Sequence, residues 1–259
     1  MHLGIIIPLK SKQTSKNWLI TCNALERTLR SLLNQTLQNY TALVCGHEKP
    51  SFLEKPDYAN IEFLGVDFSP PFSSANNFTQ KDYELDKNHK IVKGLKAMQG
   101  RDIQYWYQLD SDDLVHNGLI DSLQELKSES GALLEGGYIY YMKSKRHVKS
   151  DCMSIYCGST SILATDLLNL PEKVTLETMK DCPWARLPHM KMLSFYADIE
   201  DRNFKLVTDE LLVYMLDSGD NISNEYRDNK LKRLKSWIKP YLKGEKPNSE
   251  FKKAFSFDI

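Results

Sequence analysis

The opening of the chain constrains its fold most strongly, because a wholly apolar strand is followed by an amphipathic helix. Residues 3–9 (Leu-Gly-Ile-Ile-Ile-Pro-Leu) show no polar alternation, which is typical of a strand buried on both faces in a parallel sheet. Apolar side chains then recur every three or four positions, as on one face of a helix, at Trp18, Cys22, Leu25, Leu29 and Leu32. This alternation predicts an α/β fold with a doubly wound, mostly parallel, Rossmann-like sheet flanked by helices.

The next elements continue the alternation as far as residue 109. Apolar runs predict strands at 40–45, 61–66 and 103–109, and a helix at 89–99 precedes the last of them. Residues 69–87 are rich in Pro, Ser and Asn and have no apolar period, so they predict a long loop of the kind that is usually functional or mobile.

The second half of the chain gives weaker patterns. Residues 132–142 predict a strand interrupted by two glycines, and residues 204–216 predict either two strands or one long strand. A C-terminal extension, residues 226–259, begins with a predicted amphipathic helix at 226–243 whose outer face is basic. Beyond Gly244 the sequence is polar and predicts a loosely held tail.

Composition excludes several classes of protein. Thirty-four basic residues balance 34 acidic ones, which argues against a nucleic-acid-binding protein. No apolar run approaches the roughly 18 residues that a membrane-spanning helix needs. The five cysteines form no Cys-x-x-Cys pair, so we expect free thiols in a reducing, cytoplasmic setting. The basic face of 226–243 would also suit peripheral contact with the inner face of a membrane, although a solvated helix is the more common reason for such a face.

The predicted strand 103–109 ends in an acidic cluster, Asp110-Ser111-Asp112-Asp113. Ligands of open α/β sheets bind at the carboxyl ends of strands, and two carboxylates spaced two residues apart can face one cation. Mg²⁺ prefers oxygen ligands and takes the rest of its shell from water and phosphate, so a diphosphate would complete such a site. The alternative is that these residues only form a turn or cap a helix.

Three stretches, taken in order, resemble one enzyme family. They are Ile5–Pro8 with Leu25–Thr36, then Lys93–Ala97 with Gly100 and Tyr107–Asp113, and finally Leu211–Tyr214 with Ser218–Ser223. Their order and spacing are similar to the opening strand and helix, the metal motif and the closing strand of the family 2 glycosyltransferases. That family is inverting and has a GT-A fold.

The resemblance implies that residues 1–225 form a GT-A domain, in which 1–113 bind a nucleotide sugar and 114–225 shape the acceptor side. The donor would be UDP- or GDP-linked, and the acceptor a hydroxyl of a glycan or lipid-linked glycan. Such products belong to cell-surface polysaccharide or lipopolysaccharide. Mn²⁺ or Mg²⁺ would be held on the donor diphosphate by Asp110, Asp112 and Asp113.

The chain departs from the family at the turn where a carboxylate usually contacts the nucleotide base. Gly46-His47-Glu48 stands in place of the usual Asp-Asp, so His47, Glu48 and Asp67 become the candidates for base recognition. Other candidate donor contacts are Pro8, Ser111 and Lys90, the last as a positive charge beside the diphosphate.

A second departure concerns the general base. The family's Glu-Asp pair falls here on Pro188-His189. The imidazole of His189 could be a third metal ligand or could itself accept the proton of the acceptor hydroxyl. If His189 binds metal, Asp181 and Glu177 are the candidates for the base.

Two other functions remain open from the sequence. A nucleotidyltransferase would also use an α/β sheet and a metal-bound diphosphate, but the loop at 10–14 lacks the glycines of its phosphate-binding loop. A catalytically silent sugar-nucleotide-binding or scaffolding domain would account for the missing Glu-Asp pair. The oligomeric state has no signature in the sequence.

Overall fold

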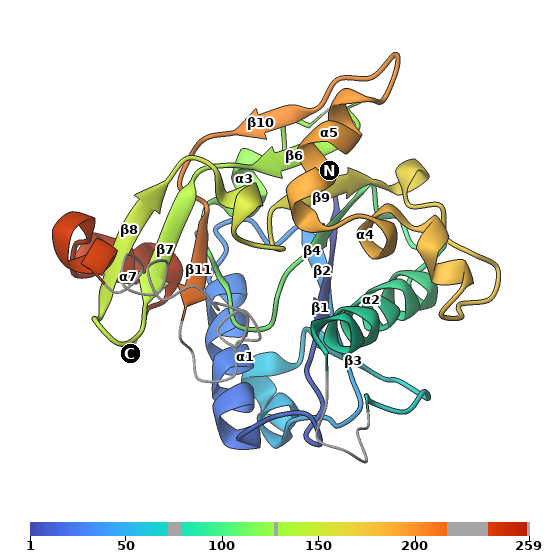
Figure 1. Ribbon diagram of the computed structural model, residues 1–259, viewed down its shortest axis with the longest axis horizontal. Helices are drawn as coiled ribbons and strands as arrows, with labels where there is room; N and C mark the ends of the chain where they lie inside the picture. The colour runs from blue at the N-terminus through green and yellow to red at the C-terminus, as the bar shows by residue number, and fades with distance from the viewer. Residues whose placement is uncertain (72–78, 127–128, 217–237, 258–259) are drawn as a thin grey trace.

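The computed structural model describes residues 1–71, 79–126, 129–216 and 238–257, which form two sheets with helices around them (Figure 1). The strands are β1 (Leu3–Pro8), β2 (Tyr40–Gly46), β3 (Ile61–Gly65), β4 (Tyr105–Gln108), β5 (Leu114–Val115), β6 (Gly131–Leu134), β7 (Gly137–Tyr141), β8 (Arg146–Ser150), β9 (Ser161–Ala164), β10 (Lys205–Val207) and β11 (Leu212–Leu216). The α-helices are α1 (Trp18–Leu33), α2 (Gln80–Ala97), α3 (Leu119–Ser122), α4 (Pro183–Arg186), α5 (Met192–Ala197) and α7 (Ser249–Phe255). Short 3₁₀ helices are η1 (Ser51–Glu54), η2 (Pro56–Tyr58), η3 (Met153–Ile155), η4 (Thr165–Leu167), η5 (Thr178–Asp181) and η6 (His189–Lys191).

The larger sheet has seven strands in the order β10-β6-β9-β4-β1-β2-β3. Strands β1 to β4 are parallel, and β9 runs antiparallel between β4 and β6. The predicted doubly wound, mostly parallel sheet is therefore confirmed. The order reverses beside β1, so the carboxyl ends of β1 and β4 border the crevice where ligands of such sheets bind.

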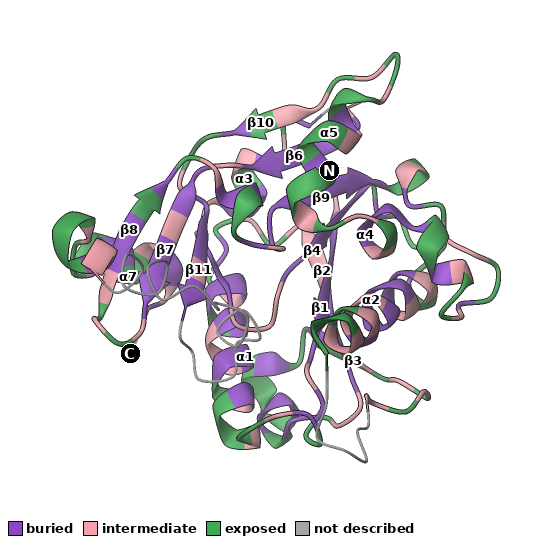
Figure 2. Ribbon diagram, in the orientation of Figure 1, coloured by how far each residue is buried: buried purple, intermediate pink, exposed green. Residues whose placement is uncertain are grey.

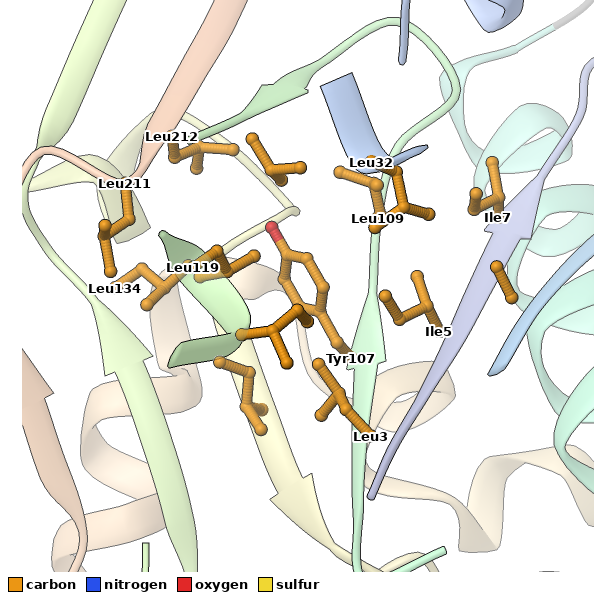
Figure 3. Packing of buried hydrophobic residues seen from close by; sticks show 14 of the residues in the cluster. Leu3, Ile5, Ile7, Leu32, Tyr107, Leu109, Leu119, Leu134, Leu211 and Leu212 are labelled. Atoms are coloured by element: carbon orange, nitrogen blue, oxygen red, sulfur yellow. The ribbon is translucent and has the colours of Figure 1, made fainter. Parts of the chain in front are cut away.

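Strand β1 is buried on both faces, which explains its unbroken apolar sequence. Ile5 and Ile7 pack with Leu25 and Leu29 of α1, whereas Ile6 packs with the core under α2 on the opposite face. Figure 3 shows Ile5 and Ile7 from close by, with Leu32 of α1 among the side chains of the same cluster, and Figure 2 shows the central strands almost wholly buried. The two helices thereby fix both sides of the sheet edge that carries the site.

The smaller sheet has four strands in the order β5-β11-β7-β8. Helix α7 covers it, with Phe251 and Phe255 packed against Tyr140 and Met215. The prediction of a loosely held tail beyond Gly244 is therefore wrong, because aromatic residues spaced four apart anchor this segment. The predicted basic helix at 226–243 falls mostly at 226–237, outside the described residues.

Two further predictions differ from the structure. Residues 80–87, predicted as a loop, form the first half of α2, which begins with a capping box between Thr79 and Asp82. The predicted strand at 132–142 is two strands, β6 and β7, which belong to different sheets. Among the described residues no helix combines the length and the apolar character that crossing a bilayer requires.

Candidate functional site

A cleft of about 320 Å³ lies at the carboxyl edge of the large sheet, between α1, α2 and the 3₁₀ helices that follow β8 and α4. Its size is in the usual range for a small-molecule site. Its lining residues are Pro8, Leu9, Lys10, Ile20, Thr21, Ala24, Gln80, Tyr83, Glu84, Asp86, Lys87, Lys90, Asp110, Ser111, Asp112, Tyr156, Cys157, Gly158, His189 and Tyr214. The lining thus combines several charged groups with a mostly apolar remainder.

Asp110 follows directly from β4 and forms an ion pair across the cleft. Its Oδ1 lies 2.5 Å from Nζ of Lys87 on α2, and its backbone N–H donates to Oγ of Ser159 at 2.9 Å. Burial lowers the pKa of Lys87, but the negative charge of Asp110 and their hydrogen bond outweigh it and leave the pKa raised. A Cβ at Gly158 would lie 3.0 Å from both charged groups, so the absence of a side chain there leaves room for the pair.

Asp112 and Ser111 also line the cleft, on the turn after β4. Asp112 is half-buried and lies near Arg27 of α1. Burial lowers the pKa of Arg27, and the charge of Asp112 opposes that shift. Two of the predicted metal-binding carboxylates, Asp110 and Asp112, therefore both line the cleft.

Asp113 is fully buried and does not line the cleft. Its Oδ2 accepts hydrogen bonds from Oγ of Ser159 at 2.6 Å and from Sγ of Cys157 at 2.9 Å. Its Oδ1 accepts from the backbone N–H of Met215 at 3.2 Å. Burial, and then the charges of Asp112 and Asp110, raise the pKa of Asp113 well above its usual range. This side chain joins the end of β4 to the 157–159 turn and to β11.

His189 lines the opposite wall of the cleft, in η6. Its Nε2 lies 3.3 Å from the carbonyl oxygen of Ile155 in η3. Burial, followed by the positive charge of Lys87, lowers the pKa of His189, although Asp110 opposes the shift. The lowered pKa favours the neutral imidazole, which is the form able to accept a proton.

Glu177 and Asp181, the other candidates for a base, are exposed and do not line the cleft. Glu177 directly precedes η5 and Asp181 is its last residue. This short helix packs against α2. The structure brings His189, and neither of these carboxylates, to the cleft.

The three candidates for base recognition also lie outside the cleft lining. Nε2 of His47 is 2.9 Å from the carbonyl oxygen of Phe68, and Oε2 of Glu48 accepts from the backbone N–H of Lys12 at 2.9 Å. Asp67 is exposed and pairs with Lys93 at 2.8 Å. Each of these side chains has a partner within the protein.

The predicted diphosphate contact, Lys90, lies in the cleft lining but is only 1% exposed and pairs with Asp86 at 2.6 Å. Burial lowers the pKa of Lys90, and Asp86 opposes the shift. Lys87, one helical position from Asp86, is 33% exposed and meets Asp110 instead. Among the lysines of α2, Lys87 is thus the better placed to meet an anion beside the aspartates.

The carboxylates of the cleft could hold a hard divalent cation only if a bound ligand supplied further oxygen atoms. Among the described residues no group of three or more His, Cys, Asp or Glu side chains is placed to hold a metal ion. Asp110 and Asp112 could supply the one or two carboxylates that Mg²⁺ commonly takes when phosphate oxygens fill the remaining positions. Lys87 would then have to leave Asp110 for the phosphate.

Searches with the sequence find no matching family model and no matching curated protein. The fold is similar to solved structures of Staphylococcus aureus TarS. For TarS 1–349 in complex with UDP-GlcNAc the TM-score is 0.52 at 13% identity, over 87% of this chain and 62% of that one. For TarS 1–349 alone the TM-score is 0.49 at 12% identity, over 83% and 60%. The chain spans about three fifths of these TarS 1–349 chains. The predicted GT-A-type fold is confirmed.

Proposed function

We propose that the protein is an inverting glycosyltransferase that moves a sugar from a UDP- or GDP-linked donor to a hydroxyl of a glycan or lipid-linked glycan. The observation that carries the proposal is the cleft itself, whose lining includes Asp110, Asp112 and His189. The GT-A-type fold and its likeness to a protein solved with UDP-GlcNAc support it. The sequence resemblance supports a role in cell-surface polysaccharide or lipopolysaccharide synthesis.

In this proposal the aspartates and Lys87 bind the donor diphosphate. Mn²⁺ or Mg²⁺ held by Asp110 and Asp112 would act as a Lewis acid that stabilises negative charge on the leaving diphosphate. Lys87 moves from Asp110 to a phosphate oxygen and adds a positive charge there. Asp113 stays buried and holds the turn in place, so we propose no metal contact for it.

His189 serves as the general base. Its neutral imidazole takes the proton of the acceptor hydroxyl, whose oxygen attacks the anomeric carbon from the face opposite the diphosphate. The single displacement inverts the configuration at that carbon.

The experiment is a thermal-shift screen with UDP-, GDP-, CMP- and dTDP-sugars, with Mn²⁺ and with EDTA, followed by an assay for released nucleotide. A donor that binds only the folded protein raises the melting temperature. Without an acceptor, an active transferase slowly transfers the sugar to water and releases the nucleotide. If no sugar nucleotide shifts the melting temperature or is hydrolysed, the proposal is wrong. A shift without release, even with a panel of glycan acceptors, would favour the silent binding domain.

A further inference from the structure

A buried ion pair in the wall of the cleft has no part in the chemistry proposed above. Asp86 and Lys90 stand one turn apart on α2, with Oδ2 and Nζ 2.6 Å from each other and side chains only 7% and 1% exposed. Both line the cleft. Burying two charges is costly, and such a pair often stabilises a fold less than apolar residues of the same size would. The pair therefore calls for another explanation.

The pair is also incompletely satisfied. Oδ1 of Asp86 is buried and has no hydrogen-bond partner among the described residues. A carboxylate that is ionised accepts on both oxygens, and an ammonium group carries three N–H donors. Within the described chain the hydrogen bond of Lys90 goes to Asp86. One acceptor and further donors thus stand side by side in the lining of the cleft.

The position of the pair suits one end of a nucleotide. Lys90 interacts electrostatically with Glu48 and Cys45 at the end of β2, whereas Lys87 meets Asp110 at the end of β4. These two strands flank β1, so their ends lie about 10 Å apart at the usual spacing of strands. A nucleoside diphosphate with its phosphates at Asp110 would extend its ribose over Pro8 and bring its base toward Asp86 and Lys90.

We propose that Asp86 and Lys90 recognise the base of the donor nucleotide, with Oδ1 of Asp86 accepting a ring N–H and Nζ of Lys90 donating to the neighbouring carbonyl oxygen. Uracil, thymine and guanine present a ring N–H beside a carbonyl, whereas cytosine and adenine present an unprotonated ring nitrogen. The inference rests on the proposed function, and it assigns base recognition to α2 rather than to the 46–48 turn. His47, whose Nδ1 is also buried without a partner among the described residues, does not line the cleft.

The test is isothermal titration of the wild-type protein and of Asp86→Asn with UDP, CDP and inorganic pyrophosphate. We expect the wild type to bind UDP at least tenfold more tightly than CDP. Asp86→Asn should reduce that ratio at least tenfold and leave pyrophosphate binding unchanged. The matched control is Asp121→Asn, which removes an exposed carboxylate of α3 outside the cleft lining and should change none of these affinities.

Three outcomes would overturn the inference: equal binding of UDP and CDP by the wild type, an unchanged ratio in Asp86→Asn, or an equal loss of UDP and pyrophosphate binding. If Asp86→Asn does not fold, the double variant Asp86→Asn with Lys90→Met removes both charges and answers the same question. Failure of the wild type to bind any nucleoside diphosphate would instead refute the proposed function. The two failures are thereby distinguished.

Discussion

The two walls of the cleft are built differently. The wall formed by α2 and the end of β4 is made of regular elements, and its charges are paired in advance, Lys87 with Asp110 and Lys90 with Asp86. The opposite wall is made of the short 3₁₀ helices η3 and η6 and the residues that follow η3, and its basic side chain in the described lining is His189.

Exposed apolar side chains mark the second wall. Tyr156, which lines the cleft, is 43% exposed, and Ile155 and Met190, beside the lining, are 57% and 56% exposed. His189 is held through the backbone of Ile155. Paired charges on rigid elements suit a ligand with fixed charges, such as a diphosphate. Short turns with apolar tips suit a partner that is recognised by shape. Under the proposed function, the first wall would bind the donor and the second would receive the acceptor.

The largest expected effect comes from replacing Asp112, on the turn after β4 in the first wall. Replacing Asp112 with Asn should lower kcat about 10²- to 10³-fold, as removal of one preorganised electrostatic contact does in other enzymes. The melting temperature should stay unchanged, because the side chain is only half-buried. Donor hydrolysis measures the first and differential scanning fluorimetry the second. The control is Asp121→Asn, which changes an exposed carboxylate on α3. Unaltered turnover in Asp112→Asn would show that Asp112 has no part in the reaction.

Breaking the second wall at His189 should cost somewhat less. His189→Ala should lower kcat about 10²-fold, the typical contribution of a general base, while donor affinity is retained. Because burial and Lys87 lower the pKa of His189, the wild-type rate should fall with acid only below the ordinary histidine value of about 6.5. The pH–rate profile of His189→Ala should lack this acid limb. A limb that persists in the variant would identify a different base.

The third prediction concerns Asp113, whose hydrogen bonds connect the two walls, and the free energy of unfolding. Asp113→Ala leaves the N–H of Met215 and the hydroxyl of Ser159 without their buried acceptor, so the free energy of unfolding should fall by about 2 kcal/mol. Urea denaturation measures this loss. Asp112→Asn is the matched neighbour and should lose little. If both variants unfold at the same urea concentration as the wild type, Asp113 does not join the two walls.

The elements with a clear apolar period were predictable from the sequence. Strand β1, helix α1 and the acidic turn after β4 are each specified locally, by an unbroken apolar run or a spacing of three and four. The approach of Asp110 and Asp112 to a cleft followed from the rule that ligands bind at strand ends.

The first half of α2 was missed because its residues are charged on nearly every side. Only Tyr83 and Leu85 are apolar between Gln80 and Asn88, so no period marks a helix there. Thr79 with Asp82, a capping box, was the available signal. Because of this error, the prediction put Asp86 and Lys87 in a loop, whereas both lie on α2. The separation of Asp113 from its neighbours was not predictable either, because it depends on contacts with Cys157 and Ser159 about 45 residues away.

The smallest expected effect tests how far the charge of one wall reaches the other. Lys87→Met removes a positive charge that opposes protonation of His189, so the pKa of His189 should rise and the acid limb of the pH–rate profile should move to higher pH. The KM for the donor should also rise about tenfold, as a charge-assisted contact to the diphosphate is lost. Lys93→Met, on the same helix but paired with Asp67 outside the cleft lining, should change neither quantity. A limb that stays in place while the KM rises would confine Lys87 to donor binding and leave the two walls electrostatically independent.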